Sequence, residues 1–369
     1  MKILRGQLVL GLAALAWMVG CASIGPPLPP SLELPKPPTD LHAARKGDRV
    51  SLTWTVPTRT TDRQRVRYLG KTRICRSLDQ VIKQCEKPVG ETESPADFRS
   101  AKKTSVKLRA TFIDTLPSIL EREHPDGFAT YAVEVLNTSG RGAGLSNQVH
   151  VPLVPTLPPF SDFSAKVVSQ GVVVTWRCAP VPGAKLNGVK YLFRIYRRQE
   201  GSTSEAKIGE LSAACVTEAD TSNGSFLDQT FEWEHTYYYR GTVVSVMEKP
   251  GKPTIEVEGD DTPEVKVFAH DIFPPAVPAG LQAVFSGPGQ QPFIDLIWAP
   301  VTDADLAGCN IYRHEAGGAA VKLNSEPVKA PAFRDMQVVS GKTYFYSVSA
   351  VDLRGNESAR SEEASETVP

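Results

Sequence analysis

The sequence predicts an all-β fold of three tandem β-sandwiches, and three observations support this prediction. The chain of 369 residues holds 28 glycines and 30 prolines between short runs rich in Val and Thr, a pattern typical of short strands joined by turns. Trp54, Trp176 and Trp298 follow one another at an equal spacing of 122 residues. Apolar and polar residues alternate before each tryptophan, which predicts a half-buried strand rather than a helix.

Four short elements recur in the same order in each third of the chain. The first is the alternating strand that ends at tryptophan, as in Val50-x-Leu52-x-Trp54. A second strand follows, then a Phe-x-Asp element, and then a last strand that begins with a tyrosine. The second strand is centred on residues 73–76, 194–197 and 310–313, the Phe-x-Asp element ends at Asp114, Asp228 and Asp335, and the tyrosines are Tyr131, Tyr239 and Tyr346. A six-residue insertion lies in the first copy, near Leu120–Gly127. The best candidate for a helix is short, from Ser118 to Glu123, and Pro125 ends it.

Together these elements resemble the fibronectin type III domain, an immunoglobulin-like β-sandwich with an early-strand tryptophan and a tyrosine on its sixth strand. The third copy also has the final turn of that family, and the second copy departs from it with a longer hairpin, Glu248–Glu264. The resemblance implies modules at 37–154, 155–272 and 273–369 in an elongated array. It places six aromatic residues in the cores, and we expect each tyrosine hydroxyl to find a backbone partner. These residues are Trp54, Trp176, Trp298, Tyr131, Tyr239 and Tyr346.

The first 36 residues predict where in the cell the protein is located. Lys2 and Arg5 precede a dozen apolar residues, too few to cross a bilayer but suited to a signal peptide, residues 1–20. The following Met18–Cys21 resembles a bacterial lipobox, which implies a diacylglycerol on Cys21; the alternative is an ordinary signal peptide with an incidental cysteine. The resemblance and Ala22 imply a bacterial cell envelope location, anchored in the outer membrane. Residues 21–36 belong to a proline-rich stretch and predict a semi-rigid tether.

Cysteines in a secreted chain are candidates for disulfides. Cys75 and Cys85 are ten residues apart within the first module, and a bond between them would fix a strand to its following loop. Cys178 and Cys215 are the candidate pair of the second module. Cys309 has no partner in the third module and is expected to be a small buried residue.

Composition and motifs exclude several classes of function. With 41 basic and 41 acidic residues, the chain predicts neither a nucleic-acid partner nor a polybasic patch for anionic lipid. The six histidines have no metal-ligand spacing, and no catalytic motif occurs, so no catalytic residue, metal or cofactor is expected. The acidic run Glu258–Asp261 offers oxygen ligands for calcium, but a solvated acidic turn is the preferred interpretation.

Two classes of function remain. The first is a non-catalytic, lipid-anchored rod that presents loops for protein–protein interaction or adhesion. The second is an accessory subunit of an envelope enzyme system that binds a polysaccharide or positions another chain, and glycan binding predicts a planar row of exposed aromatic rings. Phe231, Trp233, Tyr237 and Tyr238 form the one aromatic-rich stretch, and we expect most of them to pack in the second module. The first module's insertion and the second module's long hairpin are the expected contact regions.

Overall fold

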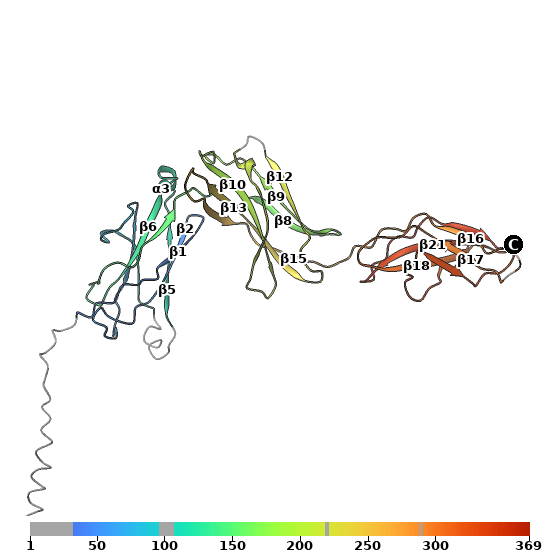
Figure 1. Ribbon diagram of the computed structural model, residues 1–369, viewed down its shortest axis with the longest axis horizontal. Helices are drawn as coiled ribbons and strands as arrows, with labels where there is room; N and C mark the ends of the chain where they lie inside the picture. Colours follow the sequence, from blue (N-terminus) through green and yellow to red (C-terminus); the bar gives the residue numbers. More distant parts are fainter. Residues whose placement is uncertain (1–31, 96–106, 218–220, 288, 290) are drawn as a thin grey trace, which may run out of the picture. The chain divides into compact units, whose positions relative to one another are not determined.

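The computed structural model describes residues 32–95, 107–217, 221–287, 289 and 291–369, and Figure 1 shows their strands. These residues form six antiparallel sheets with two short helices, α3 (Ser118–Glu123) and the 3₁₀ helix η1 (Ala214–Val216). The predicted all-β class of sandwiches is therefore confirmed. The chain divides into two compact units, Met1–Pro155 and Thr156–Pro369, and the predicted lipidation site Cys21 lies outside the described residues.

The first unit contains one sandwich. Its smaller sheet has the order β1-β2-β5 and its larger sheet the order β4-β3-β6-β7. The strands are β1 (His42–Lys46), β2 (Arg49–Thr55), β3 (Thr72–Ser77), β4 (Pro88–Thr92), β5 (Arg109–Thr115), β6 (Phe128–Val135) and β7 (Val149–Pro152). Gly47, with φ of 59°, provides the left-handed residue that the tight turn between β1 and β2 requires.

The expected helix forms at the expected residues, and α3 lies beside one end of the first sandwich (Figure 1). Arg45 of β1 fixes it, because this buried guanidinium lies 2.6 Å from the Glu121 carboxylate and also donates to the Pro152 carbonyl. A buried ion pair needs such additional hydrogen bonds to offset its desolvation. The insertion is thus attached firmly to the sandwich.

The second unit begins with a sandwich of the same design, whose sheets have the orders β12-β9-β8 and β11-β10-β13-β14. The strands are β8 (Ser161–Val168), β9 (Gly171–Cys178), β10 (Val189–Gln199), β11 (Ala206–Ser212), β12 (Ser222–Asp228), β13 (Thr236–Met247), β14 (Ile255–Asp261) and β15 (Val265–Phe268). The long hairpin is explained by β13, which pairs with β14 along its second half and with β15 along its first half.

The same unit holds a third set of sheets, with the orders β16-β17-β20 and β19-β18-β21-β22. The strands are β16 (Gln282–Phe285), β17 (Ile294–Ile297), β18 (Leu306–Glu315), β19 (Val321–Lys322), β20 (Ala332–Asp335), β21 (Thr343–Asp352) and β22 (Ala364–Thr367). In all three sandwiches, the first, second and fifth strands in chain order form one sheet, and the remaining strands form the other.

Each sandwich has its own hydrophobic core. The six aromatic residues expected in the cores are all buried: Trp54, Trp176, Trp298, Tyr131, Tyr239 and Tyr346. The tryptophans alternate with more exposed neighbours, because one face of each of their strands enters a core. The tyrosine strands β6 and β21 are more fully covered, since Thr130, Ala132 and Ser347 are buried as well. Within the described part of the chain, no helix is both long and apolar enough to span a bilayer.

Candidate functional site

An arginine, an aspartate and a tyrosine meet in every sandwich and connect its two sheets. In the first, Asp114 of β5 accepts a hydrogen bond of 2.6 Å from the Tyr131 hydroxyl of β6, and Arg76 of β3 lies 2.6 Å from the same carboxylate oxygen. The equivalent groups in the other sandwiches lie 2.6–2.9 Å apart and are Arg197, Asp228 and Tyr239, then Arg313, Asp335 and Tyr346. The repeated sequence elements therefore meet at one buried point.

This contact corrects the expectation that the tyrosines find backbone partners, because each hydroxyl donates to a carboxylate instead. Burial and the hydrogen bond to Asp114 raise the pKa of Tyr131 well above its usual range. Burial raises the pKa of Asp228, but hydrogen bonds from Thr230, Arg197 and Tyr239 outweigh this and hold it below its ordinary value. The Asp228 carboxylate is thus held in its ionised form at the point where the two sheets meet.

Both candidate cysteine pairs are joined by disulfides in the structure. Cys178, on β9, shares the inward face with Trp176 and connects the core of the second sandwich to Cys215 in η1. Cys75 instead lies on the outer face of β3, where Cys85 and Ile82 cover it. Cys309 is a free thiol, and it is buried as expected.

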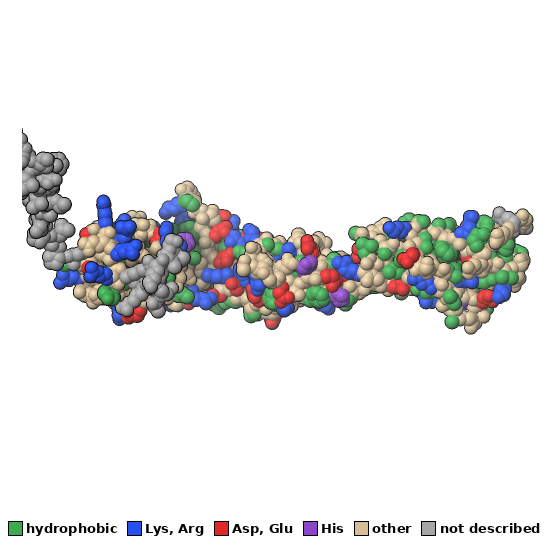
Figure 2. Space-filling view, turned by 90° about the horizontal axis from the view of Figure 1, so that it is seen from below, with side chains coloured by type: hydrophobic (Ala, Val, Ile, Leu, Met, Phe, Trp, Pro, Cys, Tyr) green, Lys and Arg blue, Asp and Glu red, His purple; other side chains and the backbone are tan. Residues whose placement is uncertain are grey.

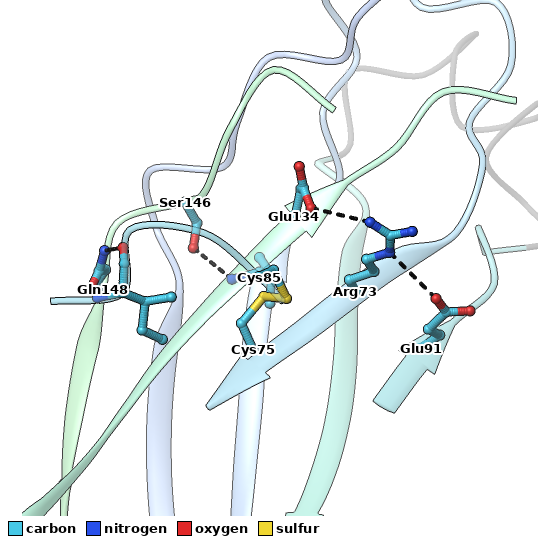
Figure 3. The surroundings of a disulfide bond; sticks show 9 residues. Arg73, Cys75, Cys85, Glu91, Glu134, Ser146 and Gln148 are labelled. Atoms are coloured by element: carbon cyan, nitrogen blue, oxygen red, sulfur yellow. Dashed lines mark hydrogen bonds and ion pairs between the residues drawn. A yellow bond between two sulfur atoms is a disulfide. The ribbon is translucent and has the colours of Figure 1, made fainter. Parts of the chain in front are cut away.

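The Cys75–Cys85 bond is one of several contacts that fix the loop between β3 and β4. Figure 3 shows Gln148 beside this disulfide. The Gln148 side chain accepts from the Ile82 amide and donates to the Ile82 carbonyl, both at 2.8 Å. The Thr130 hydroxyl donates to the Asp79 carbonyl at 2.6 Å. The loop nevertheless exposes Leu78 and Val81, at 45% and 62% of their surface, and borders an open hollow of about 850 Å³.

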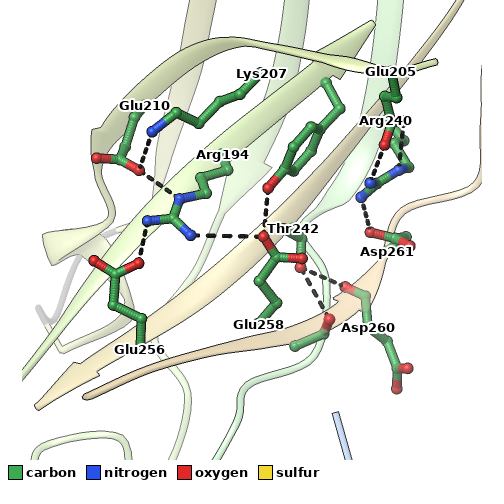
Figure 4. Close-up of polar contacts among 12 residues, drawn as sticks. Arg194, Glu205, Lys207, Glu210, Arg240, Thr242, Glu256, Glu258, Asp260 and Asp261 are labelled. Atoms are coloured by element: carbon green, nitrogen blue, oxygen red, sulfur yellow. Dashed lines mark hydrogen bonds and ion pairs between the residues drawn. The ribbon is translucent and has the colours of Figure 1, made fainter. Parts of the chain in front are cut away.

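One face of the larger sheet in the second sandwich carries a network of charged groups, shown in Figure 4. Arg194 of β10 bonds to Glu210 and Glu256 and lies 3.6 Å from Glu258. Arg240 of β13 likewise bonds to both Glu205 and Asp261. Burial lowers the pKa of Arg194, but its hydrogen bonds to Glu210 and Glu256 raise it above its ordinary value.

This network overturns the interpretation of Glu258–Asp261 as a solvated turn. These residues lie on β14, where the Glu258 carboxylate meets Arg194 and the Tyr196 hydroxyl and the Asp261 carboxylate meets Arg240. Burial and the bond to Glu258 raise the pKa of Tyr196 to about 12. Each arginine is thus held between at least two carboxylates, so the network occupies both guanidinium groups within the sheet.

A different acidic cluster lies within the second unit. Carboxylate oxygens of Asp271, Asp305 and Asp352 all lie within 4.8 Å of one another, the kind of ligand that calcium prefers. Arg354 approaches Asp271 to 3.6 Å, and the Asn356 amide donates to Asp352 at 2.8 Å. Arg354 brings one positive charge against three carboxylates, and the Asn356 amide is neutral, so these partners compensate only part of the charge.

The aromatic-rich stretch does not form a planar row. Phe231 and Trp233 meet edge to face at 4.8 Å and pack against the core of the second sandwich, where Tyr237 is buried. Tyr238 lies on the other side of its strand, under the Arg198 guanidinium at 4.5 Å. The stretch thus packs internally, as expected for most of these rings, and lacks the flat surface on which sugar rings stack.

Two features were missed at the level of sequence. The first is the aspartate partner of each tyrosine, whose fixed position in all three copies is the signal in the sequence. The second is the basic loop between β2 and β3, "RTTDRQRVR", residues 59–67. The balanced charge of the whole chain concealed it.

No family model matches the chain. Part of it is similar to amylopullulanases: 37% identity over 91 residues with that of Thermoanaerobacterium saccharolyticum, and 35% over 94 residues with that of Thermoanaerobacterium thermosulfurigenes. These matches cover 25% and 26% of this chain but only 7% and 5% of the two relatives. The chain thus spans a small fraction of the curated relatives it matches, and each matched region is about as long as one sandwich.

Among solved structures, the FN1–FN3 domains of chicken CNTN1 match 91% of this chain and 100% of that chain, with 14% identity and a TM-score of 0.27. An Fn3-like protein from Clostridium thermocellum matches 26% of this chain and 96% of that chain, with 30% identity and a TM-score of 0.23. Both structural neighbours are fibronectin type III domain proteins. The sandwich fold itself follows from the strand order and the separate cores described above.

Proposed function

We propose that this chain is a non-catalytic, lipid-anchored protein of the bacterial cell envelope that presents fibronectin type III-like modules to a protein partner. The observation that carries the proposal is the loop after β3 of the first sandwich, residues 78–85, whose backbone is fixed by several contacts. A disulfide, Gln148 and Thr130 hold its backbone, while Leu78 and Val81 stay exposed. A preordered loop loses little conformational entropy on binding, so its exposed apolar side chains favour contact with another protein.

The buried carboxylates of the three sandwiches support the non-catalytic part of the proposal. Asp114, Asp228 and Asp335 each bind both an arginine and a tyrosine. Every buried side-chain nitrogen and oxygen of the described residues has a hydrogen-bond partner. Catalytic groups, by contrast, need polar atoms that are available to a substrate.

The contact is tested by placing a photo-crosslinking residue at Val81 in intact cells. We expect one defined protein adduct from Val81 and none from Val321, a matched control that is 64% exposed on β19 of the third sandwich. Equal adduct patterns from both positions would contradict a specific contact at the loop. The anchor is tested separately by mass spectrometry of the mature N-terminus, where an unmodified Cys21 would remove it.

The similarity to amylopullulanases favours a second candidate, an accessory module of a glycan-active system. Phe231 and Trp233 are not coplanar and so do not form a flat surface for sugar rings. In this second candidate, the module would therefore position a separate catalytic chain rather than bind the glycan itself. Electrophoresis in gels that contain pullulan distinguishes the two forms. Retarded migration would indicate direct glycan binding, and unchanged migration would leave only the positioning role.

A further inference from the structure

The charge of the chain is divided unequally along the sequence. Residues 37–154 contain 19 Lys and Arg against 13 Asp and Glu, whereas residues 155–369 contain 19 against 27. In Figure 2, Lys and Arg side chains are prominent on the visible face of the first unit. The overall balance of the chain therefore hides a basic first module, which corrects the expectation that no polybasic patch exists.

Four arginines of this module lie in one loop between β2 and β3. Arg59, Arg63, Arg65 and Arg67 are all exposed, whereas Val66 between the last two is buried with Val56. Val66 packs against Val56 in a small hydrophobic cluster. Because neighbouring side chains of an extended segment point to opposite sides, Arg65 and Arg67 point away from this cluster. We call these four residues the arginine loop.

The arginine loop has a defined shape. Arg59 and Arg65 face each other in an antiparallel bridge, and the Thr60 amide donates to the Gln64 carbonyl at 2.9 Å. Arg63 closes the turn with φ of 64°. Like charges directly opposite each other in a β-ladder are unfavourable, so the fold retains a local repulsion that an anionic ligand would relieve.

Acidic neighbours compensate this charge only in part. Glu33 lies 3.8 Å from Arg67, and Asp62 accepts a hydrogen bond from the Thr60 hydroxyl. Within the described residues, Arg63 and Arg65 form no ion pair. At least two guanidinium groups, each able to bind phosphate through two parallel hydrogen bonds, are thus available at the tip of the loop.

The loop is paired with the end of the predicted tether. The Lys36 amide donates to the Arg59 carbonyl at 2.9 Å, and the Thr61 amide donates to the Leu34 carbonyl at 3.0 Å. Leu34 follows Cys21 by only 13 residues, which at ~3.1 Å per residue of polyproline II would span about 40 Å. A lipid on Cys21 would therefore keep the arginine loop near the membrane surface.

We propose that the arginine loop binds the phosphate groups of anionic phospholipids in the membrane to which Cys21 is anchored. The physiological role rests on the proposed lipid anchor, but binding by the loop does not. Basic residues near an anionic surface each strengthen binding by about fivefold, an effect that salt screens within a Debye length. The loop would hold the first module against the bilayer and give the tethered chain a fixed orientation.

The test uses the chain from Ala22 onward, which lacks Cys21 and the apolar leader but retains the tether and every described strand. Its co-sedimentation is measured with vesicles of phosphatidylglycerol and phosphatidylcholine, and with vesicles of phosphatidylcholine alone. We expect salt-sensitive binding to the anionic vesicles only. R63Q/R65Q should weaken this binding by about 25-fold, from two arginines at about fivefold each, with an unchanged circular dichroism spectrum.

The matched control is K166Q/K185Q, which removes two exposed lysines from the second sandwich and should bind like the unaltered chain. Equal binding to both kinds of vesicle, or binding by R63Q/R65Q at the unaltered level, would overturn the proposal. Tighter binding to a single-stranded oligonucleotide than to anionic vesicles would also overturn it, in favour of a nucleic-acid surface. Because no lipidated protein is used, a negative result leaves the separate test of Cys21 intact.

Discussion

The Tyr131 hydroxyl donates a 2.6 Å hydrogen bond to the Asp114 carboxylate, and this bond joins the two sheets of the first sandwich. Tyr131 lies on β6 of the larger sheet and Asp114 on β5 of the smaller sheet. The Arg76 guanidinium, also from the larger sheet, binds the same carboxylate oxygen. A hydrogen bond to an ionised group contributes more than a neutral one, and here it also fixes the distance between the sheets.

Removal of this hydroxyl should therefore weaken one sandwich and spare the others. We expect Y131F to lower the free energy of unfolding of the first sandwich by about 1.5–3 kcal/mol. Hydrogen–deuterium exchange resolved by peptide measures this as lost protection in β2 and β6. Peptides of the second and third sandwiches provide the internal control.

A double-mutant cycle with D114A separates the hydrogen bond from other effects of the substitutions. The coupling between Tyr131 and Asp114 should be about 1–3 kcal/mol, as for residues in direct contact. Additive effects of Y131F and D114A would show that the bond contributes nothing to stability. Uniform loss of protection in all three sandwiches would show that the effect is not local.

The equivalent aspartate of the second sandwich should make stability depend on acid. The pKa of Asp228 is lowered from its ordinary value of 3.8 on folding, so its contribution is fully present above about pH 4 and is lost as the pH falls through the lower, folded pKa. In urea unfolding, D228N should be less stable than the unaltered chain at pH 7. The difference should shrink as the pH falls through the lowered pKa of folded Asp228, because the carboxylate of the unaltered chain then becomes neutral as well.

The control for this experiment is D162N, because Asp162 is exposed at the start of β8. Its substitution should leave the dependence on pH unchanged. A constant difference between D228N and the unaltered chain from pH 7 to acid would contradict a lowered pKa at Asp228.

The strands were predictable from sequence because their signals are local. Alternation before Trp54 marks a strand with one buried face whatever its partner is, and Pro117 and Pro125 limit α3 on both sides. Cys75 and Cys85 were a candidate pair because they are near each other in sequence within one module. In these cases the relevant neighbours lie within about ten residues.

The remaining features depend on neighbours that are distant in sequence. The carboxylate partner of Tyr131 is set by how the two sheets align, which alternation within one strand does not specify. Glu258 is a strand residue because β14 pairs with β13. Its side-chain partners, Arg194 and Tyr196, come from β10, which lies on the other side of β13. The arginine loop was concealed for another reason, since a sum over the whole chain discards the position of each charge.

The two disulfides should differ in their contribution to stability. In the chain-entropy model, the bond that closes 37 residues, Cys178–Cys215, contributes about 4 kcal/mol, and the bond that closes 10 residues, Cys75–Cys85, about 3 kcal/mol. C178A/C215A should therefore destabilise the second sandwich more than C75A/C85A destabilises the first. Hydrogen exchange of each sandwich, measured within the same chain, gives both values.

Thiol titration of the unfolded, unreduced chain from Ala22 onward checks that both bonds form. Only Cys309 should react, because the other four cysteines are paired. Reaction of five thiols would show that neither bond is present. A smaller effect of C178A/C215A than of C75A/C85A would indicate that strain or residual structure outweighs loop length.

Gly224 should tolerate no side chain, because it lies directly opposite Trp176 in the pairing of β12 with β9. A Cβ atom at this position would lie 2.1 Å from the indole ring, well inside van der Waals contact, and the ring is packed within the core. Displacing a large buried ring by overpacking costs about 1–3 kcal/mol. We therefore expect G224A to lower the unfolding free energy of the second sandwich by this amount, measured by urea unfolding. S225A, at the next and exposed position of the same strand, should have little effect, and equal stability of G224A and S225A would mean that the indole moves aside without cost.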